Sequence, residues 1–137
     1  MAITSAICNS YKKELFDGTH AAADAYKIAL YSDAATLSAA TTAYASTNEV
    51  TGAGYTEGGK TLTGFASGLD GSTAYLTFTD ISWTSATITA RGCLIYNSSK
   101  SNKAVAAFDF GANIVSTNGT FTVDFPGTGA TSLIRIA

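Results

Sequence analysis

Charged residues are scarce in this chain of 137 residues. Asp, Glu, Lys and Arg make up 13% of it, about half of the roughly 25% that is usual in soluble domains. The basic residues are scattered, and Lys12 and Lys13 are the only adjacent cations, so the clustered positive charge of a nucleic-acid groove is missing. No apolar run approaches the roughly 18 residues of a membrane-spanning helix. We therefore expect neither a nucleic-acid partner nor a membrane partner.

Metal-binding and redox-active side chains are equally few. The chain has two cysteines, Cys8 and Cys93, and a single histidine, His20. They show no zinc-ligand spacing, and two cysteines are too few for a disulfide scaffold. A lone histidine without a placed nucleophile or second acid favours a role at a helix end or an interface over general-base catalysis. We expect unbridged thiols, no catalytic or metal site and no cofactor.

The N-terminal residues do not show the pattern of a secretory signal peptide. The short apolar stretch "AITSAI" precedes the first cations, which is the reverse of their order in a secretory signal. We therefore expect synthesis in a reducing cytosol.

What the chain does contain is a series of strand-like segments. They are rich in Thr, Val, Ile and aromatic residues and are separated by polar stretches such as "NSSKSNK", "STNG" and "PGTGAT". No helical segments lie between them, which favours an antiparallel β-sandwich, jelly-roll or immunoglobulin-like, with a small barrel as the alternative. The expected strands cover residues 25–31, 73–83, 85–97, 103–111, 119–125 and 132–137.

One amphipathic helix is expected at the N-terminus. Apolar residues recur every four positions from residue 3 to residue 15, which is close to a helical period. Gly18 follows as a suitable C-terminal stop. We predict a single domain over 1–137, in which 1–18 form this helix and 61–137 form a β-rich core.

The segment 32–60 differs from both of these parts. It is rich in Gly, Ser and Thr and poor in apolar residues, so we expect an irregular segment of the kind that is usually functional or mobile. Within it, one face of a short helix could be formed by Ala34, Leu37, Thr41 and Tyr44.

The stretch "GYTEGGKT", Gly54–Thr61, matches the pattern of a nucleotide-binding phosphate loop. Such a loop needs a buried strand before it and a helix after it, because the loop amides and the helix N-terminus together hold the phosphates. Here "YASTNEVTGA" precedes the pattern, and "LTGFASGLDG" follows it with glycines at 64, 68 and 71. Each glycine in a helix interior costs about 1 kcal/mol. We therefore interpret the match as a glycine-rich loop between strands.

Five blocks, in chain order, resemble a group of small structural proteins of tailed bacteriophages. They are "SAICNSYKKELFDGTH", "YKIALY", "NEVTGAGYTEGGKTL", "NGTFTVDFP" and "LIRIA". In that group "GYT-x-GG-x-x-L" recurs as a motif in its own right, so the resemblance implies that Lys60 completes the phosphate-loop pattern by accident. It also implies a non-enzymatic virion component with no catalytic residues.

The role that we favour is a capsid decoration, or cement, protein that bridges subunits of the major capsid protein. A tail or fibre component, including a glycan-binding adhesin module, is the alternative. Many copies or a homo-oligomer are expected, assembled into the virion in the bacterial cytoplasm. Low charge suits contact faces, since interface cores are depleted in charge. We expect the interface to use exposed residues of the N-terminal helix and of the irregular segment: Ile3, Ile7, Tyr11, Leu15, Leu37, Tyr44, Val50 and Tyr55.

Overall fold

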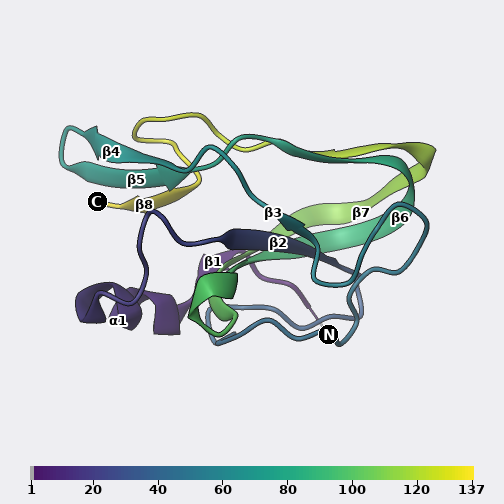
Figure 1. Ribbon diagram of the computed structural model, residues 1–137, viewed down its shortest axis with the longest axis horizontal. Helices are drawn as coiled ribbons and strands as arrows, with labels where there is room; N and C mark the ends of the chain where they lie inside the picture. The colour runs from purple at the N-terminus through teal and green to yellow at the C-terminus, as the bar shows by residue number, and fades with distance from the viewer. Residues whose placement is uncertain (1) are drawn as a thin grey trace. The chain divides into compact units, whose positions relative to one another are not determined.

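The computed structural model describes residues 2–137, and this part of the chain is mainly β (Figure 1). Its strands form two antiparallel sheets, and one short α-helix lies near the N-terminus. The mainly β class, the antiparallel pairing and the N-terminal helix are confirmed, and two such sheets are the components of a β-sandwich. The elements are β1 (Ala6–Ile7), α1 (Asn9–Asp17), β2 (Tyr26–Tyr31), β3 (Lys60–Thr61), β4 (Ala66–Asp70), β5 (Thr73–Thr77), β6 (Ile81–Asn97), the 3-10 helix η1 (Ser98–Lys100), β7 (Lys103–Val123) and β8 (Ile134–Ile136).

The chain groups into two compact units. Unit 1 runs to Thr61 and resumes over Trp83–Phe121, and unit 2 comprises Leu62–Ser82 and Thr122–Ala137. The five-stranded sheet, in the order β1-β7-β6-β2-β3, lies in unit 1 apart from the outermost residues of β6 and β7. The three-stranded sheet, in the order β4-β5-β8, lies in unit 2. The single domain expected over 1–137 stays a prediction.

Strands β2 and β6 form the centre of unit 1. They pair without a break from Tyr26 opposite Asn97 to Tyr31 opposite Gly92. Successive residues of a strand point to opposite faces, yet every residue of β6 from Gly92 to Asn97 is buried. Both faces of the pair are therefore covered, which explains the run of apolar residues in "CLIY".

Unit 2 is built on a hairpin. Strands β4 and β5 pair from Ala66 opposite Thr77 to Asp70 opposite Thr73, and β8 pairs with the other side of β5. Gly71 in the turn has a φ of 60°, which glycine adopts without steric cost. Three aromatic rings pack together in this unit: Phe65 meets Phe78 edge-on, and Phe78 is next to Phe125.

The N-terminal helix is shorter than predicted. Only Asn9–Asp17 are helical, and Gly18 ends the helix with a φ of 71° as expected. The preceding residues are extended: β1 pairs with β7, and Ile3 forms a parallel bridge with Leu37. The prediction of helix over 2–8 is therefore wrong, because extended pairing outweighs a local four-residue period. The first residue of the predicted helix lies outside the described part of the chain.

Two further expectations are corrected. The segment 32–60 is irregular as predicted, but it contains turns and isolated bridges in place of the short helix suggested for 34–44. The polar stretch "STNG" is not a turn, since β7 continues through it to Val123 with Asn118 at a φ of 46°. Pairing with β6 holds these polar residues in a strand that their composition alone does not predict.

Candidate functional site

A buried carboxylate organises the irregular segment of unit 1. Glu49 is 9% exposed. Its Oε1 accepts a hydrogen bond from the Tyr44 hydroxyl at 2.6 Å. Its Oε2 accepts one from the Tyr55 hydroxyl and one from the backbone N–H of Gly58, the latter at 2.8 Å. We call these four residues the Glu49 cluster. Three donors satisfy the carboxylate, as a buried charge requires.

Strands β2 and β6 hold this cluster in place. The N–H of Val50 donates to the carbonyl of Leu30 at 2.9 Å, which fixes the segment beside β2. The Tyr96 hydroxyl donates to the carbonyl of Gly58 at 2.6 Å, and its ring stacks on that of Tyr44 with centroids 4.7 Å apart. The Glu49 cluster therefore ties the irregular segment to the central strand pair.

The phosphate-loop pattern Gly54–Thr61 lies in this arrangement. One of its amides, that of Gly58, already binds the Glu49 carboxylate. Gly59 has a φ of 78°, and a Cβ built on it would lie 1.7 Å from the carbonyl oxygen of Ile28. The two glycines therefore serve close packing of the loop against β2 and binding of a carboxylate from the same chain.

Lys60 is part of a strand. It pairs with Ile28 in the β2–β3 ladder, and its ammonium lies 5.8 Å from the centre of the Trp83 ring. In a phosphate loop a helix would begin at this point and the lysine would reach the phosphates. The loop interpretation made from the sequence is supported by the Glu49 cluster and by this strand.

Tyrosine ionisation should make the fold sensitive to alkali. Burial raises the pKa of Tyr96 to about 12. Burial, and then the hydrogen bond to Glu49, raise the pKa of Tyr44 and of Tyr55 even more. The folded state keeps these protons to a higher pH than the unfolded state does, so their contribution to stability is complete below about pH 10 and is lost above it.

We therefore expect the free energy of unfolding to fall from about pH 8 to about pH 11. Chemical denaturation followed by circular dichroism at each pH measures it, and ultraviolet absorbance reports the tyrosinates. Equal stability at the two pH values would contradict this prediction.

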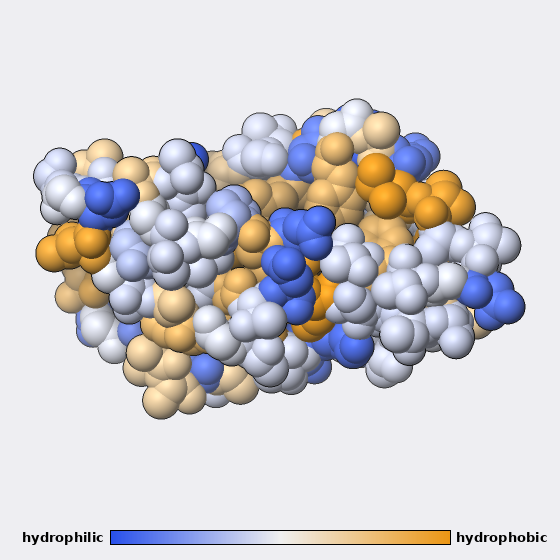
Figure 2. Space-filling model, turned by 90° about the horizontal axis from the view of Figure 1, so that it is seen from above, coloured by the Kyte–Doolittle hydropathy of each residue, from blue (hydrophilic) through white to orange (hydrophobic). Residues whose placement is uncertain are grey.

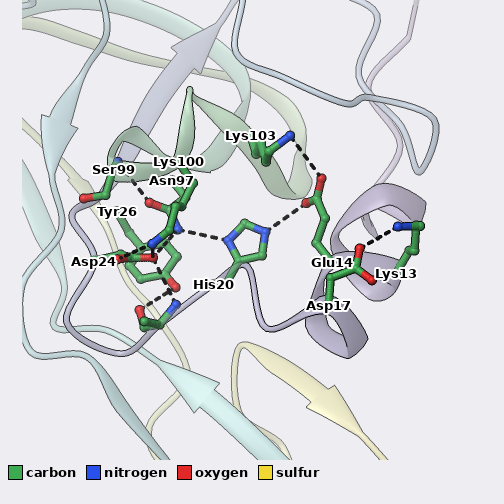
Figure 3. A network of polar contacts seen from close by, with 11 residues as sticks. Lys13, Glu14, Asp17, His20, Asp24, Tyr26, Asn97, Ser99, Lys100 and Lys103 are labelled. Atoms are coloured by element: carbon green, nitrogen blue, oxygen red, sulfur yellow. Dashed lines mark hydrogen bonds and ion pairs between the residues drawn. The ribbon is translucent and has the colours of Figure 1, made fainter.

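A second polar network joins α1 to the end of β6 (Figure 3). The His20 side chain is 1% exposed and lies between Glu14 and Asn97. Its Nε2 is 2.9 Å from Glu14 Oε1, and its Nδ1 is 3.0 Å from Asn97 Nδ2. Asn97 Oδ1 accepts from the N–H of Ser99, which identifies Nδ2 as the donor. His20 Nδ1 is therefore the acceptor, and Nε2 carries the proton that is donated to Glu14.

The same network continues to a carboxylate and a lysine. Asn97 Nδ2 also donates to Asp24, and Lys100 lies 3.0 Å from both Asp24 oxygens. The hydrogen bond from Asn97, with those from Ala21 and Lys100, lowers the pKa of Asp24 to about 2. Both nitrogens of His20 are thus engaged inside the protein, which supports the structural, helix-end role expected from the sequence.

The thiols are unbridged, as predicted. Cys8 and Cys93 are both buried and free. Burial raises the pKa of Cys8 to about 11 and that of Cys93 to about 12, so both stay protonated near neutral pH. Within residues 2–137, no group of three or more His, Cys, Asp or Glu side chains is placed to hold a metal ion. No helix in that range is long and apolar enough to cross a membrane.

Half of the eight expected interface residues lie inside the protein. The structure buries Ile3, Tyr11, Leu37 and Val50, so the prediction that they are exposed is wrong. Their partners belong to this chain: Ile3 and Leu37 form a bridge, Val50 hydrogen-bonds to Leu30 of β2, and the Tyr11 ring lies 4.7 Å from that of His20. Ile7, Tyr44 and Tyr55 are half-buried, and Leu15 remains exposed. A contact role for these four stays a prediction.

Other apolar side chains are more exposed than those expected. Phe16 on α1 is 94% exposed, and the others are Leu69, Ile114, Val115 and Ile136. The sequence carried a signal for Phe16: it follows Leu15, and two adjacent helical residues cannot both occupy a narrow buried stripe. Figure 2 shows a face dominated by pale, weakly polar groups, with patches of orange and blue.

Comparison with protein families, with curated proteins and with solved structures found no match to this chain.

Proposed function

We propose that this chain is a non-enzymatic structural protein of a tailed-phage virion, and that many copies bind the capsid as a decoration protein. The Glu49 cluster is the observation that carries the proposal. The recurring block "GYTEGGKTL" of the phage group supplies Tyr55 and Gly58 to this cluster, so its residues serve folding. A motif of that kind is expected in a protein selected for a rigid shape.

The side chains best suited to act as a catalytic acid or base are hydrogen-bonded within this chain. Glu49 and His20, the most deeply buried acid and the single histidine, have all their bonding atoms occupied by this chain. A catalytic acid or base must reach a substrate atom directly or through one water. This arrangement supports a structural role over an enzymatic one.

Phe16 is the candidate anchor for the capsid subunit. Its ring is 94% exposed on a helix that the His20 network attaches firmly to the sheet. Aromatic side chains held on rigid elements are typical binding hot spots, and truncation of one costs about 2 kcal/mol or more. Leu15 beside it would extend the same apolar contact.

The test uses particles of the phage whose genome encodes the chain. Particle imaging locates the protein, quantitative mass spectrometry counts its copies, and capsid melting is compared with and without it. Hundreds of copies on the shell and a higher melting temperature are expected, since a protein that binds only assembled capsid stabilises it by mass action. A few copies confined to the tail would reject decoration in favour of the tail alternative.

The contact itself is tested with two truncations. Phe16→Ala should lower capsid affinity roughly 30-fold, the equivalent of about 2 kcal/mol. Leu69→Ala is the matched control, because Leu69 is also strongly exposed but lies in unit 2. Equal occupancy for Phe16→Ala and the unmodified chain would remove Phe16 from the interface.

A further inference from the structure

Strand β7 has an outer edge that is paired over a small part of its length. The strand is 21 residues long, and its neighbours in the sheet are β6 on one side and β1 on the other. Strand β1 pairs only with Ala106 and Ala107. Within residues 2–137, no strand pairs with this edge after Asp109. The N–H of Gly111 donates to Asp109 Oδ1 at 2.9 Å, and the backbone groups that follow it on this edge are available to another strand.

The open part of β7 is also uncovered on its faces. Residues 111–115 are exposed one after another, although neighbouring residues of a strand point to opposite faces. Two of them are large and apolar: Ile114 is 44% exposed and Val115 is 62% exposed. Gly111 and Asn118, both with positive φ, bound this stretch. We call residues 111–118 the open edge.

The open edge carries none of the usual protection against pairing. Natural edge strands are guarded by charged side chains or by proline. Three short edge strands of the two sheets follow this rule, with Lys60 in β3, Asp70 in β4 and Arg135 in β8. No charged residue and no proline occurs in β7 after Asp109. This absence sets the open edge apart.

We propose that the open edge pairs antiparallel with the same edge of a second copy of this chain. A two-fold axis at Val115, the most exposed apolar residue of the stretch, would place Val115 opposite itself and Asn113 opposite Thr117. A neutral edge suits self-pairing because no like charges face each other across the axis. Residues 111–118 themselves offer a partner no charge to recognise, and the Asp33 carboxylate beside them accepts from Asn113 Nδ2 at 3.4 Å. The inference goes beyond the proposed function, since it concerns the chain alone and needs no capsid.

The test is sedimentation velocity on the purified chain, with a pair of charge variants. The unmodified chain should form dimers in a concentration-dependent manner. Val115→Lys and Val115→Glu should each weaken dimerisation about tenfold or more, because each variant places like charges opposite each other. A mixture of the two should restore dimers. Leu69→Lys is the control and should dimerise like the unmodified chain, and circular dichroism checks that every variant is folded.

Several results would overturn the proposal. They are an unmodified chain that stays monomeric at its highest soluble concentration, dimers that tolerate both charge variants, a mixture that stays monomeric, and dimers lost in Leu69→Lys. Because no capsid is present, none of these results bears on the decoration role. Failure of the capsid experiment would likewise leave the edge pairing standing.

Discussion

Replacing Glu49 by alanine is expected to lower the free energy of unfolding by about 3–5 kcal/mol, because three donors lose the buried carboxylate that accepts their hydrogen bonds. The substitution leaves the Tyr44 and Tyr55 hydroxyls and the Gly58 N–H without their acceptor. Unsatisfied buried donors cost roughly 1–3 kcal/mol each. Urea denaturation followed by circular dichroism measures the loss.

The control for this change is Glu57→Ala. Glu57 is an exposed carboxylate in the same segment, and such surface changes usually stay within about 0.5 kcal/mol. If Glu49→Ala does not fold, Glu49→Gln provides the measurement. The glutamine amide keeps one acceptor oxygen, but its NH₂ group replaces the second oxygen and cannot accept a hydrogen bond from the donors there. A loss below about 1 kcal/mol in both Glu49 variants would contradict the structural role of the Glu49 cluster, since one hydrogen bond to a charged group exceeds that.

Gly59→Ala should be at least as damaging, although it adds a single methyl group. The new Cβ would lie 1.7 Å from the carbonyl oxygen of Ile28, so β2 or the loop has to move. Overpacking of this kind costs about 1–3 kcal/mol or more, and the φ of 78° adds strain for any residue with a Cβ. We expect a total loss of about 3 kcal/mol or more in chemical denaturation.

Gly18→Ala separates the two causes. Gly18 has a similar φ of 71°, but a Cβ there would meet no atom within 4 Å. Its cost should therefore be the backbone term alone, about 1–2 kcal/mol. If Gly59→Ala cost no more than Gly18→Ala, the close approach of the loop to β2 would be absent in solution.

The strands were predictable where local pattern and tertiary environment agree. Residues 25–31 and 85–97 are rich in β-branched and aromatic side chains, and both segments are strands. The pattern failed at the N-terminus, because Ile3 and Ile7 suit a helical face and a strand equally well. Pairing of Ile7 with β7 and of Ile3 with Leu37 decided between them, and no local signal in the sequence reports such pairing.

The functional residues were harder to predict. Glu49 sits in "STNEVTG", which reads as an exposed polar loop, and its burial depends on tyrosines and a glycine that only the fold brings together. His20 and Asn97 are 77 positions apart in the chain. The open edge of β7 could not be predicted either, because the sequence shows which residues are strand-like but not which strand lacks a neighbour.

We propose that "GYTEGGKT" is a packing element held by Glu49 and does not bind nucleotide. Isothermal titration calorimetry of the folded chain with ATP and with GTP, in the presence of magnesium, tests it most directly. We expect no binding heat for either nucleotide and the same result for Lys60→Ala, because the Gly58 amide already binds a carboxylate and Lys60 belongs to a strand. Micromolar binding that disappears in Lys60→Ala would contradict it.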